Sequence, residues 1–428
     1  MTTATLAGAS FWTTLSWDPT MRRLSLLLFV LTGCGPVDPE SPVQLDGPVE
    51  RYGFITRLGN DTVAAEWIAR SPNGLVSDAV DRWPFVRHRH TELEIAPDGR
   101  LVRMVMDVRT PSGATPAERE RRVVAQFTDD SVRITIRDSS GTTGRNFATG
   151  GALTVPHASM QYSVIEFEIA AALQRGAAAG QGVGDTLGFL QFYPDRDVGP
   201  AFVLHRGQVH PLGGGRVELR HGWLAGVADV MVDSAGRMLS YTGDRTTYKV
   251  AVERITEEPS IEAIAATLAA REQRTGASQL SVRDTVHATI GSTVLGVDYG
   301  RPLARGRVLL GNVISYDRVW RTGANAATQF STSLPIELAG LELAAGTYTL
   351  WTIPRAGGVQ LIVNRQVGQW GTTFDAAQNL GTASMTVDTL TTPVEQFTIA
   401  VEPIDDRRGT LTMEWGTFRW SAPIVVRP

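Results

Sequence analysis

The segment from residue 93 to residue 108, LEIAPDGRLVRMVMDV, decides the fold class of this chain. Two apolar runs flank a turn from Ala96 to Gly99, whose sequence is Ala-Pro-Asp-Gly. Proline, aspartate and glycine favour tight turns, so the segment is typical of a β-hairpin. A second instance of this pattern lies between residues 230 and 241. We therefore expect an antiparallel β domain over residues 49–255.

One helix interrupts this β pattern. Ser163 and Glu166 have the spacing of a capping box, and Ile165, Ile169 and Leu173 would share one helical face before Gly176 ends the helix. We expect this helix to pack across the sheet.

Residues 256–281 have a different composition, with an alanine-rich stretch from Ile261 to Arg274. This stretch predicts a helical connector between two domains. Beyond it, residues 282–428 again show short strand-like runs, at Val308–Leu310, Tyr348–Ile353, Val359–Val363, Phe397–Val401 and Thr410–Trp415. Such a series predicts a β-sandwich-like domain, so the fold class is mainly β with two domains.

Length and composition agree with this division. A chain of 428 residues is longer than the roughly 250 to 300 residues at which a single core stops growing. Its content of 43% hydrophobic and 20% charged residues is that of a globular protein. A formal net charge of −4, without a clustered basic face, argues against nucleic-acid binding.

The single cysteine, Cys34, follows a short export-like segment. Arg22 and Arg23 precede an apolar run from Leu24 to Leu31, and Thr32 and Gly33 are small. The segment resembles the lipobox of bacterial lipoprotein signal peptides, which implies cleavage before Cys34 and lipid attachment to its thiol. The apolar run is about half of the ~20 residues that a membrane-spanning helix needs. We therefore expect residues 1–34 to be a signal peptide, with Met21 as an alternative start.

Residues 35–48 are rich in proline and acidic side chains and lack periodicity, which predicts a flexible tether. Gly35 stands where an aspartate commonly retains lipoproteins at the inner membrane. The resemblance therefore implies a cell-envelope protein, attached to the membrane by its lipid on the periplasmic face of the outer membrane.

The region from about Leu280 to Val426 resembles the bacterial family of unknown function numbered 2911. The residues that carry the resemblance are Val297-Asp298-Tyr299-Gly300-Arg301-Pro302, Gly306-Arg307-Val308, Val319-Trp320-Arg321-Thr322-Gly323-Ala324-Asn325, Gly346-Thr347-Tyr348-Thr349-Leu350-Trp351-Thr352-Ile353-Pro354, Gln369-Trp370-Gly371 and Glu395-Gln396-Phe397. Ala326 departs from the pattern, because a carboxylate commonly follows the asparagine. The resemblance implies a β-sandwich-like domain of exported proteins and no reaction.

Within this region, Trp320, Arg321 and Asn325 form the densest polar-aromatic cluster. Arginine and asparagine could hold a carboxylate or a sugar hydroxyl, with tryptophan as a stacking face. The alternative is that Arg321 pairs with an internal acid such as Glu395, while Trp320 lies in the core. Trp351 and Trp370 belong to the same candidate ligand-binding set, and core packing is again the alternative.

A metal site is a weaker hypothesis. His88, His90 and Glu92 alternate along a predicted strand, so their side chains would share one face. The residues that could complete such a site are His205, His210 and His221, whereas His157 and His287 stand alone and are interpreted as structural. No metal and no other cofactor is therefore expected.

No catalytic motif is found. The sequence contains neither a Gly-x-Ser-x-Gly elbow nor a Gly-x-x-x-x-Gly-Lys phosphate loop. Three functions stay open: a non-enzymatic protein that binds a glycan, lipid or envelope-protein ligand, a glycan or ester hydrolase, and a lipid carrier. A converging acid pair would indicate the hydrolase, an apolar cup within residues 49–255 the carrier, and an exposed row of tryptophans glycan binding.

Overall fold

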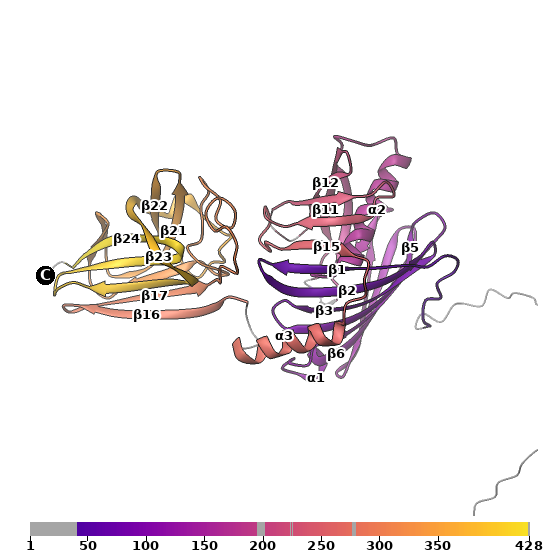
Figure 1. Ribbon diagram of the computed structural model, residues 1–428, viewed down its shortest axis with the longest axis horizontal. Helices are drawn as coiled ribbons and strands as arrows, with labels where there is room; N and C mark the ends of the chain where they lie inside the picture. The colour runs from indigo at the N-terminus through magenta and orange to yellow at the C-terminus, as the bar shows by residue number, and fades with distance from the viewer. Residues whose placement is uncertain (1–40, 195–201, 223, 225, 276–279, 427–428) are drawn as a thin grey trace, which may run out of the picture. The chain divides into compact units, whose positions relative to one another are not determined.

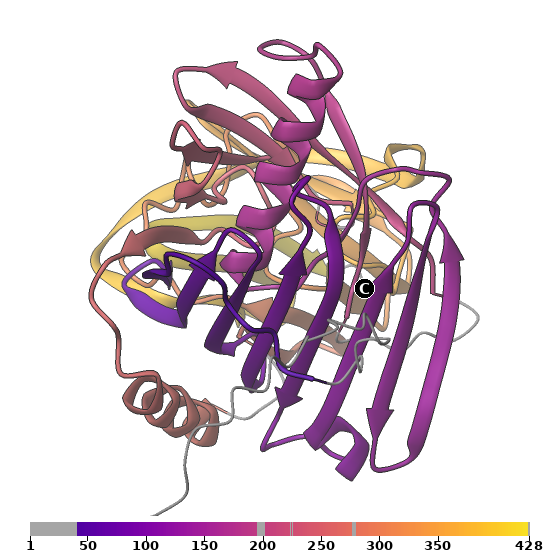
Figure 2. The ribbon, with the colours of Figure 1, turned by 90° about the vertical axis from the view of Figure 1, so that its right-hand side faces the viewer.

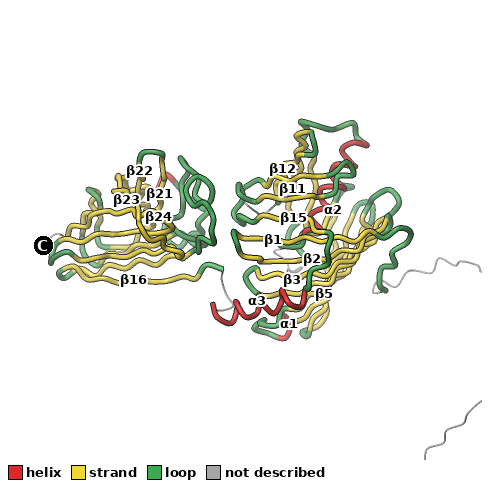
Figure 3. The backbone as a smooth tube through the Cα atoms, in the orientation of Figure 1, coloured by secondary structure: helices red, strands yellow, loops and turns green. Residues whose placement is uncertain are grey.

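The computed structural model describes residues 41–194, 202–222, 224, 226–275 and 280–426. The predicted signal peptide and Cys34 lie outside these residues. The described chain is mainly β, with few helices (Figure 3). Its strands form one sheet in the N-terminal part and a second in the C-terminal part, which confirms the predicted fold class (Figure 1).

The N-terminal sheet has 15 strands, and neighbours along the chain are mostly neighbours in the sheet. Its strands are β1 (Glu50–Leu58), β2 (Asp61–Ser71), β3 (Gly74–Arg82), β4 (Val86–Ile95), β5 (Leu101–Arg109), β6 (Glu120–Phe127), β7 (Ser131–Asp138), β8 (Gly141–Ala148), β9 (Thr154–Pro156), β10 (Leu187–Phe192), β11 (His205–Gly213), β12 (Arg216–Arg220), β13 (Ala228–Val232), β14 (Met238–Thr242) and β15 (Ala251–Ile255). The order runs from β8 down to β1 and then from β15 down to β9. Among the described strands of this sheet, only the pair of β9 with β10 is parallel.

The hairpin from which the fold class was predicted joins β4 and β5. Leu93 pairs with Met104, and the turn closes where the Ala96 amide donates to the Arg100 carbonyl at 2.8 Å. Gly99 has a φ of +83°, a conformation that favours glycine. The second predicted hairpin is also confirmed, as β13 and β14.

Helix α2 (Tyr162–Ala178) lies against the sheet face that carries the main apolar core, and it contacts β2, β9, β10 and β11 (Figure 2). The predicted helix is confirmed, but the predicted end at Gly176 is wrong, because the helix continues through Gly176 to Ala178. Every residue from Tyr162 to Ile169 is buried, so this half of the helix is enclosed on all sides. The predicted capping box of Ser163 and Glu166 is wrong, because a carboxylate from β2 caps the helix instead.

Helix α3 (Ile261–Thr275) agrees with the predicted connector helix, but it also packs onto the N-terminal sheet. Ala265 and Leu268 form a small apolar cluster with Ala65, Val80 and Val86. Ala65 is adjacent in β2 to the residue that caps α2, and neighbouring strand residues point to opposite faces. Helices α2 and α3 therefore cover opposite faces of the sheet. The short helix α1 (Pro116–Arg119) precedes β6.

The last residues of the predicted tether lie against the N-terminal sheet. Val43 is 9% exposed, and its amide donates to the carboxylate of Glu92. The guanidinium of Arg103 donates to the Ser41 carbonyl at 2.7 Å. The proline-rich composition predicted no regular structure, yet backbone groups of this segment are held by side chains of β4 and β5.

The C-terminal sheet has nine strands in the order β16-β17-β18-β21-β22-β23-β24-β19-β20. They are β16 (Val282–Ile290), β17 (Thr293–Arg301), β18 (Thr328–Thr332), β19 (Ile336–Leu338), β20 (Leu341–Leu343), β21 (Gly346–Arg355), β22 (Gly358–Asn364), β23 (Asn379–Pro403) and β24 (Arg408–Val426), with a 3-10 turn, η1 (Ala376–Gln378), before β23. Strands β16 and β17 also contact β23, so the sheet folds over its own core as a sandwich does.

One predicted strand in this domain is wrong. Residues 308–310 lie in a turn, where Leu310 makes only an isolated bridge to Ile314. Arg305, Gly306 and Gly311 on either side have positive φ angles of 51°, 69° and 88°, which break an extended strand. The other four predicted runs fall within β21, β22, β23 and β24.

Candidate functional site

A row of polar and aromatic residues crosses six strands on the α3 face of the N-terminal sheet. Each member is the direct cross-strand partner of the next, and the row reads Trp67, Asp78, His90, Asp107, Arg122 and Arg137. Directly paired residues project from the same face of a sheet, about 5 Å apart. The row therefore places an indole, an imidazole, carboxylates and guanidinium groups on one surface.

Pairwise contacts hold the middle of this row in place. His90 Nδ1 lies 2.8 Å from Asp78 Oδ1, and Arg122 Nη1 donates to Asp107 Oδ2 at 2.9 Å. The hydrogen bond to Asp78 raises the pKa of His90. His88 lies two positions earlier in β4, and its pKa is lowered, mainly by burial and further by Arg109. The two histidines of one strand thus differ in their tendency to carry charge.

The row lines a groove of about 1020 Å³. Trp67 stands at one side, where its indole lies over Gly53 of β1, so closely that a Cβ on Gly53 would come within 2.8 Å of the ring. The charged residues that line the groove carry both signs, and they are Arg89, Arg109, Arg119, Arg121, Arg122, Arg137, Asp78, Asp107, Glu120, Asp138, Glu258 and Glu262. Such a lining suits a polar ligand with many hydrogen-bonding groups better than a simple anion.

The structure does not bring the predicted metal ligands of β4 together with His205, His210 or His221, which were proposed to complete the site. His88, His90 and Glu92 do share a face, and His90 Nε2 lies 3.3 Å from Glu92 Oε1. The second carboxylate oxygen of Glu92 accepts from the Val43 amide. Among the described residues, the only group of at least three His, Cys, Asp or Glu side chains close enough to hold a metal lies elsewhere.

On the opposite face, three buried glutamates lie in or beside helix α2, namely Glu66, Glu166 and Glu168. Glu66 of β2 accepts from the backbone amides of Tyr162 and Ser163 at 2.7 and 2.9 Å, and also contacts the Ser163 hydroxyl. It thereby satisfies amides of the first helical turn and places negative charge at the positive end of the helix. Burial nevertheless raises the pKa of Glu66.

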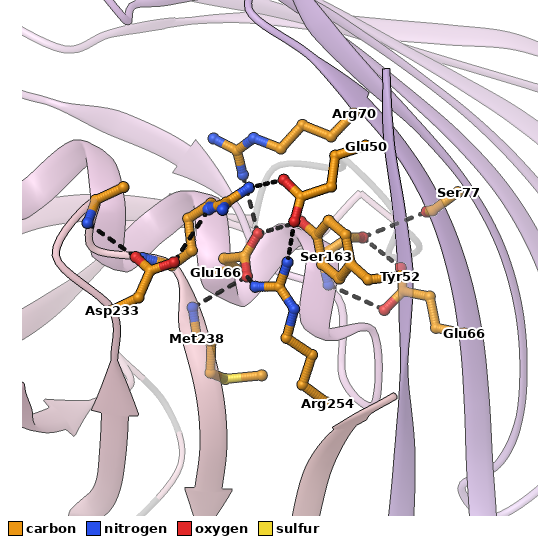
Figure 4. A network of polar contacts seen from close by, with 12 residues as sticks. Glu50, Tyr52, Glu66, Arg70, Ser77, Ser163, Glu166, Asp233, Met238 and Arg254 are labelled. Atoms are coloured by element: carbon orange, nitrogen blue, oxygen red, sulfur yellow. Dashed lines mark hydrogen bonds and ion pairs between the residues drawn. The ribbon is translucent and has the colours of Figure 1, made fainter. Parts of the chain in front are cut away.

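Glu166, one turn along the helix, lies among arginines (Figure 4). It accepts from Arg70 Nη1 at 2.9 Å and from the Met238 amide at 3.0 Å, and it contacts the Tyr52 hydroxyl. Arg254 Nη1 lies 3.7 Å from the carboxylate, while the same guanidinium stacks 3.7 Å above the Tyr52 ring. Burial raises the pKa of Glu166, and the two arginines oppose this shift. Glu166 is therefore a buried carboxylate whose charge is compensated by Arg70 and Arg254.

Glu168, two positions further, lies among histidines. Its Oε1 is 2.9 Å from His157 Nδ1, and its Oε2 accepts from Gln191 Nε2 at 2.9 Å. The rings of His157 and His221 meet edge to face with centroids 4.7 Å apart. Burial raises the pKa of Glu168 well above its usual value, and burial together with His157 lowers that of His221.

The tryptophans predicted as a possible glycan platform are mostly in the core of the C-terminal domain. Trp320 is half-buried and packs against Trp415 and Trp420, with ring centroids 6.1 Å apart in each case. Trp351 is 1% exposed and packs against Phe374, whereas Trp370 is 55% exposed. The five tryptophans therefore form no exposed row, and Trp370 is the accessible member.

Arg321 and Asn325 lie close together and hold a loop. Arg321 Nη1 is 3.4 Å from the Asn325 carbonyl, which also accepts from the Gly371 amide at 2.9 Å. Gly371 has to be a glycine, since a Cβ there would come within 2.1 Å of Arg321 Cδ. The proposed partner Glu395 instead accepts from the Arg305 amide. Burial lowers the pKa of Arg321. Arg321, Asn325 and Gly371 therefore contact one another and hold this loop, and ligand binding by Arg321 and Asn325 stays a prediction.

Sequence reasoning did not find the cluster around Glu168. His157 was interpreted as structural, and His221 was assigned to a set on β4. The available signal was a pair of glutamates, Glu166 and Glu168, in an otherwise apolar helix segment. Charged residues in such a segment are rarely buried unless partners neutralise them, but the sequence does not say which partners.

Comparison with known proteins finds one family model, over the C-terminal region. Residues 281–424 match the model of DUF2911, described as a protein of unknown function, which confirms the resemblance of the C-terminal region. No curated protein matches the chain.

Two solved structures resemble part of the chain. A DUF1089 family protein from Pseudomonas aeruginosa is 17% identical, with 43% of this chain and 91% of that chain covered and a TM-score of 0.31. A β-barrel-like protein of the domain of unknown function DUF1849 from Brucella abortus is 13% identical, with 48% and 94% covered and a TM-score of 0.31.

Proposed function

We propose that this protein is an exported lipoprotein, anchored through Cys34 at the periplasmic face of the outer membrane, whose N-terminal domain binds an envelope glycan. The observation that carries the glycan is the row from Trp67 to Arg137 along the groove. None of the helices in the described ranges has the length and apolar character to span a membrane.

The chemistry of the groove fits a saccharide. Sugar rings combine an apolar face with hydroxyl groups that both donate and accept hydrogen bonds. Trp67 offers an aromatic surface. Asp78 is oriented by its contact with His90, and Asp107 and Arg122 are oriented by their contact with each other, so acceptors and donors are already in place. A preoriented site loses less conformational entropy when a ligand binds.

The glycan hypothesis can be tested by exchanging one tryptophan at a time. We expect purified peptidoglycan or lipopolysaccharide oligosaccharides to bind the full-length protein in isothermal titration calorimetry. Trp67→Ala should weaken this binding roughly tenfold, which corresponds to ~1.4 kcal/mol. Trp370→Ala is the matched control, because it removes an exposed indole from the C-terminal domain. Loss of binding in the Trp370 variant alone would move the site to the family-like region and refute the groove.

The anchor is tested separately. Metabolic labelling with a fatty acid should mark the wild type and should not mark Cys34→Ser. The serine variant should also leave the membrane fraction. Label that persists on the serine variant would refute lipidation at this residue.

A glycan hydrolase is the second candidate, and one observation favours it. Asp78 and Asp107 both pair with His90 across the sheet, so two carboxylates flank one imidazole in the groove. Two interstrand spacings separate their backbones by roughly 10 Å, and an inverting glycoside hydrolase needs its two carboxyl groups about 6.5–9.5 Å apart, so the two side chains would have to lean toward each other. Release of reducing sugar ends from peptidoglycan, abolished in Asp78→Asn and Asp107→Asn, would favour this candidate over binding alone.

A lipid carrier is less well supported. Such a carrier needs an apolar cup in the concave face of the sheet. In the described residues this face holds helix α2, the main apolar core and the buried carboxylates Glu66, Glu166 and Glu168.

A further inference from the structure

Three potential metal ligands from separate elements meet inside the N-terminal domain. His157 follows β9, Glu168 belongs to α2, and His221 follows β12. One ligand atom from each of them lies within 4.8 Å of the others, and the three residues are 2%, 0% and 5% exposed. Two imidazoles and one carboxylate, from segments far apart in the sequence, thus face the same small volume.

One of these ligands has an unsatisfied nitrogen. His221 Nε2 lies 3.3 Å from the Tyr241 hydroxyl, whereas His221 Nδ1 is buried and has no hydrogen-bond partner among the described residues. A buried polar atom without a partner costs about 1–3 kcal/mol. The contact with Tyr241 orients the ring in the way that second-shell hydrogen bonds orient metal-binding histidines, and it leaves Nδ1 available.

Glu168 also has no permanent cation among its hydrogen-bond partners in the described residues. Its contacts are with His157 and Gln191, neither of which carries a permanent positive charge. Glu166 on the same helix meets two arginines, so the fold supplies cations to one buried carboxylate and not to the other. A bound dication would neutralise Glu168 and would accept the lone pair of His221 Nδ1.

We propose that His157, Glu168 and His221 form a buried binding site for a divalent transition-metal ion, with zinc as the ion that best suits two imidazoles and one carboxylate. Ligand atoms at 2.0–2.1 Å from a tetrahedral zinc lie roughly 3.3 Å apart. The 2.9 Å between His157 Nδ1 and Glu168 Oε1 is close to that spacing. A modest inward movement of His221 completes three protein ligands, and a water molecule would take the fourth position.

This site is independent of the proposed glycan groove, which lies on the other face of the sheet. His157 Nδ1 and Glu168 Oε1 lie 2.9 Å apart, so a metal ion would bind between atoms that already face each other. Gln191 and Tyr241 would hold the carboxylate and the imidazole from outside.

The test is a zinc titration of the full-length protein after treatment with EDTA. In competition with a chromophoric chelator, we expect one equivalent of ZnCl₂ to bind tightly, and CoCl₂ to give the intense visible absorption of a four-coordinate site. Glu168→Gln and His221→Gln should each weaken binding about 100-fold or more, because even second-shell substitutions cost 10–100-fold. His210→Gln is the matched control, since His210 is a histidine of β11 that contacts only the Asp185 carbonyl among the described residues.

The wild type decides the outcome even if a variant does not fold. Wild-type protein that binds no zinc or cobalt under these conditions would overturn the proposal. Equal binding by wild type and by folded Glu168→Gln, with folding verified by near-ultraviolet circular dichroism, would assign the metal to other residues and would also overturn it. Loss of binding in His210→Gln would have the same meaning.

Discussion

Glu166 and Glu168 lie two positions apart in the same buried helix, yet their surroundings differ completely. Glu166 meets Arg70, Arg254 and the Tyr52 hydroxyl, whereas Glu168 meets His157 and Gln191 (Figure 4 shows the Glu166 network). Positions two apart in a helix point in different directions, so each carboxylate faces a different part of the enclosing sheet.

The different partners of Glu166 and Glu168 indicate different roles for the two carboxylates. A buried carboxylate that is paired with arginines is already stabilised, and its removal leaves buried cations behind. A buried carboxylate among neutral groups carries a desolvation cost that a proton or a metal ion can relieve. We therefore expect the Glu166 cluster to maintain the fold and the Glu168 cluster to respond to pH and to metal ions.

The largest effect is expected at Glu166. Glu166→Gln should lower the free energy of unfolding by about 3–5 kcal/mol, because it leaves the guanidinium groups of Arg70 and Arg254 without their buried partner. Urea denaturation measures this loss. Glu50→Gln is the control, since Glu50 also binds Arg254 but is 43% exposed in its side chain, and its effect should be about 1 kcal/mol or less. Equal losses in both variants would contradict the distinction between buried and exposed pairing.

Glu168 and His221 should contribute to the pH dependence of the free energy of unfolding with opposite signs. Because burial raises the pKa of Glu168, the folded state holds this proton more tightly, and the contribution of Glu168 to stability falls as the pH rises above 4.5. Because the pKa of His221 is lowered, its contribution is complete above pH 6.5 and is lost as the pH falls below that value.

These signs can be measured with EDTA present. The stability advantage of the wild type over Glu168→Gln should decrease with rising pH, while its advantage over His221→Gln should increase up to pH 6.5. Each slope is at most about 1.4 kcal/mol per pH unit for one proton. Two slopes of the same sign would show that burial does not govern these groups.

Without metal, Glu168→Gln should be a mild change. The glutamine has nearly the same shape as the glutamate, and its amide oxygen can accept from Gln191 Nε2 while its NH2 group faces His157 Nδ1. We expect a change in unfolding free energy of about 1 kcal/mol at neutral pH, well below that of Glu166→Gln. A loss as large as that of Glu166→Gln, measured in the same denaturation experiment, would place both glutamates in the structural class.

The smallest effect is expected in the groove. Arg122→Gln breaks the 2.9 Å contact with Asp107, but the two side chains are 32% and 43% exposed, so the change in stability should be below about 1 kcal/mol. Thermal unfolding of the variant should therefore resemble that of the wild type. A large destabilisation would indicate that the polar row maintains the sheet and would weaken its assignment as a binding surface.

Much of the fold could be predicted because its signals are local. Turn residues between alternating runs predicted the hairpins β4–β5 and β13–β14, and apolar periodicity predicted α2 and α3. Residues 308–310 were assigned wrongly because an apolar triplet is compatible with a strand, whereas the positive φ angles around it are not visible in its composition. The capping of α2 was assigned wrongly because Glu66, which performs it, lies about 100 residues earlier in the chain.

The candidate sites could be predicted only in part. Alternation in β4 correctly placed His88, His90 and Glu92 on one face, but it could not supply Trp67, Asp78 or Arg122, since these join the row only through the register of other strands. Within residues 281–424, which match an uncharacterised family, the neighbouring residues Arg321 and Asn325 hold a loop through a contact that the sequence did not indicate.

Neighbouring residues and their periodicity were enough to predict that this protein is mainly β, where its principal hairpins turn, and that its C-terminal region resembles a known family. The approach of His157 and His221 to Glu168, and not to the histidines of β4, became visible in the folded chain alone, as did the arginines around Glu166. Strand register and the placement of one helix against a 15-stranded sheet determine those meetings, and both are properties of the whole domain.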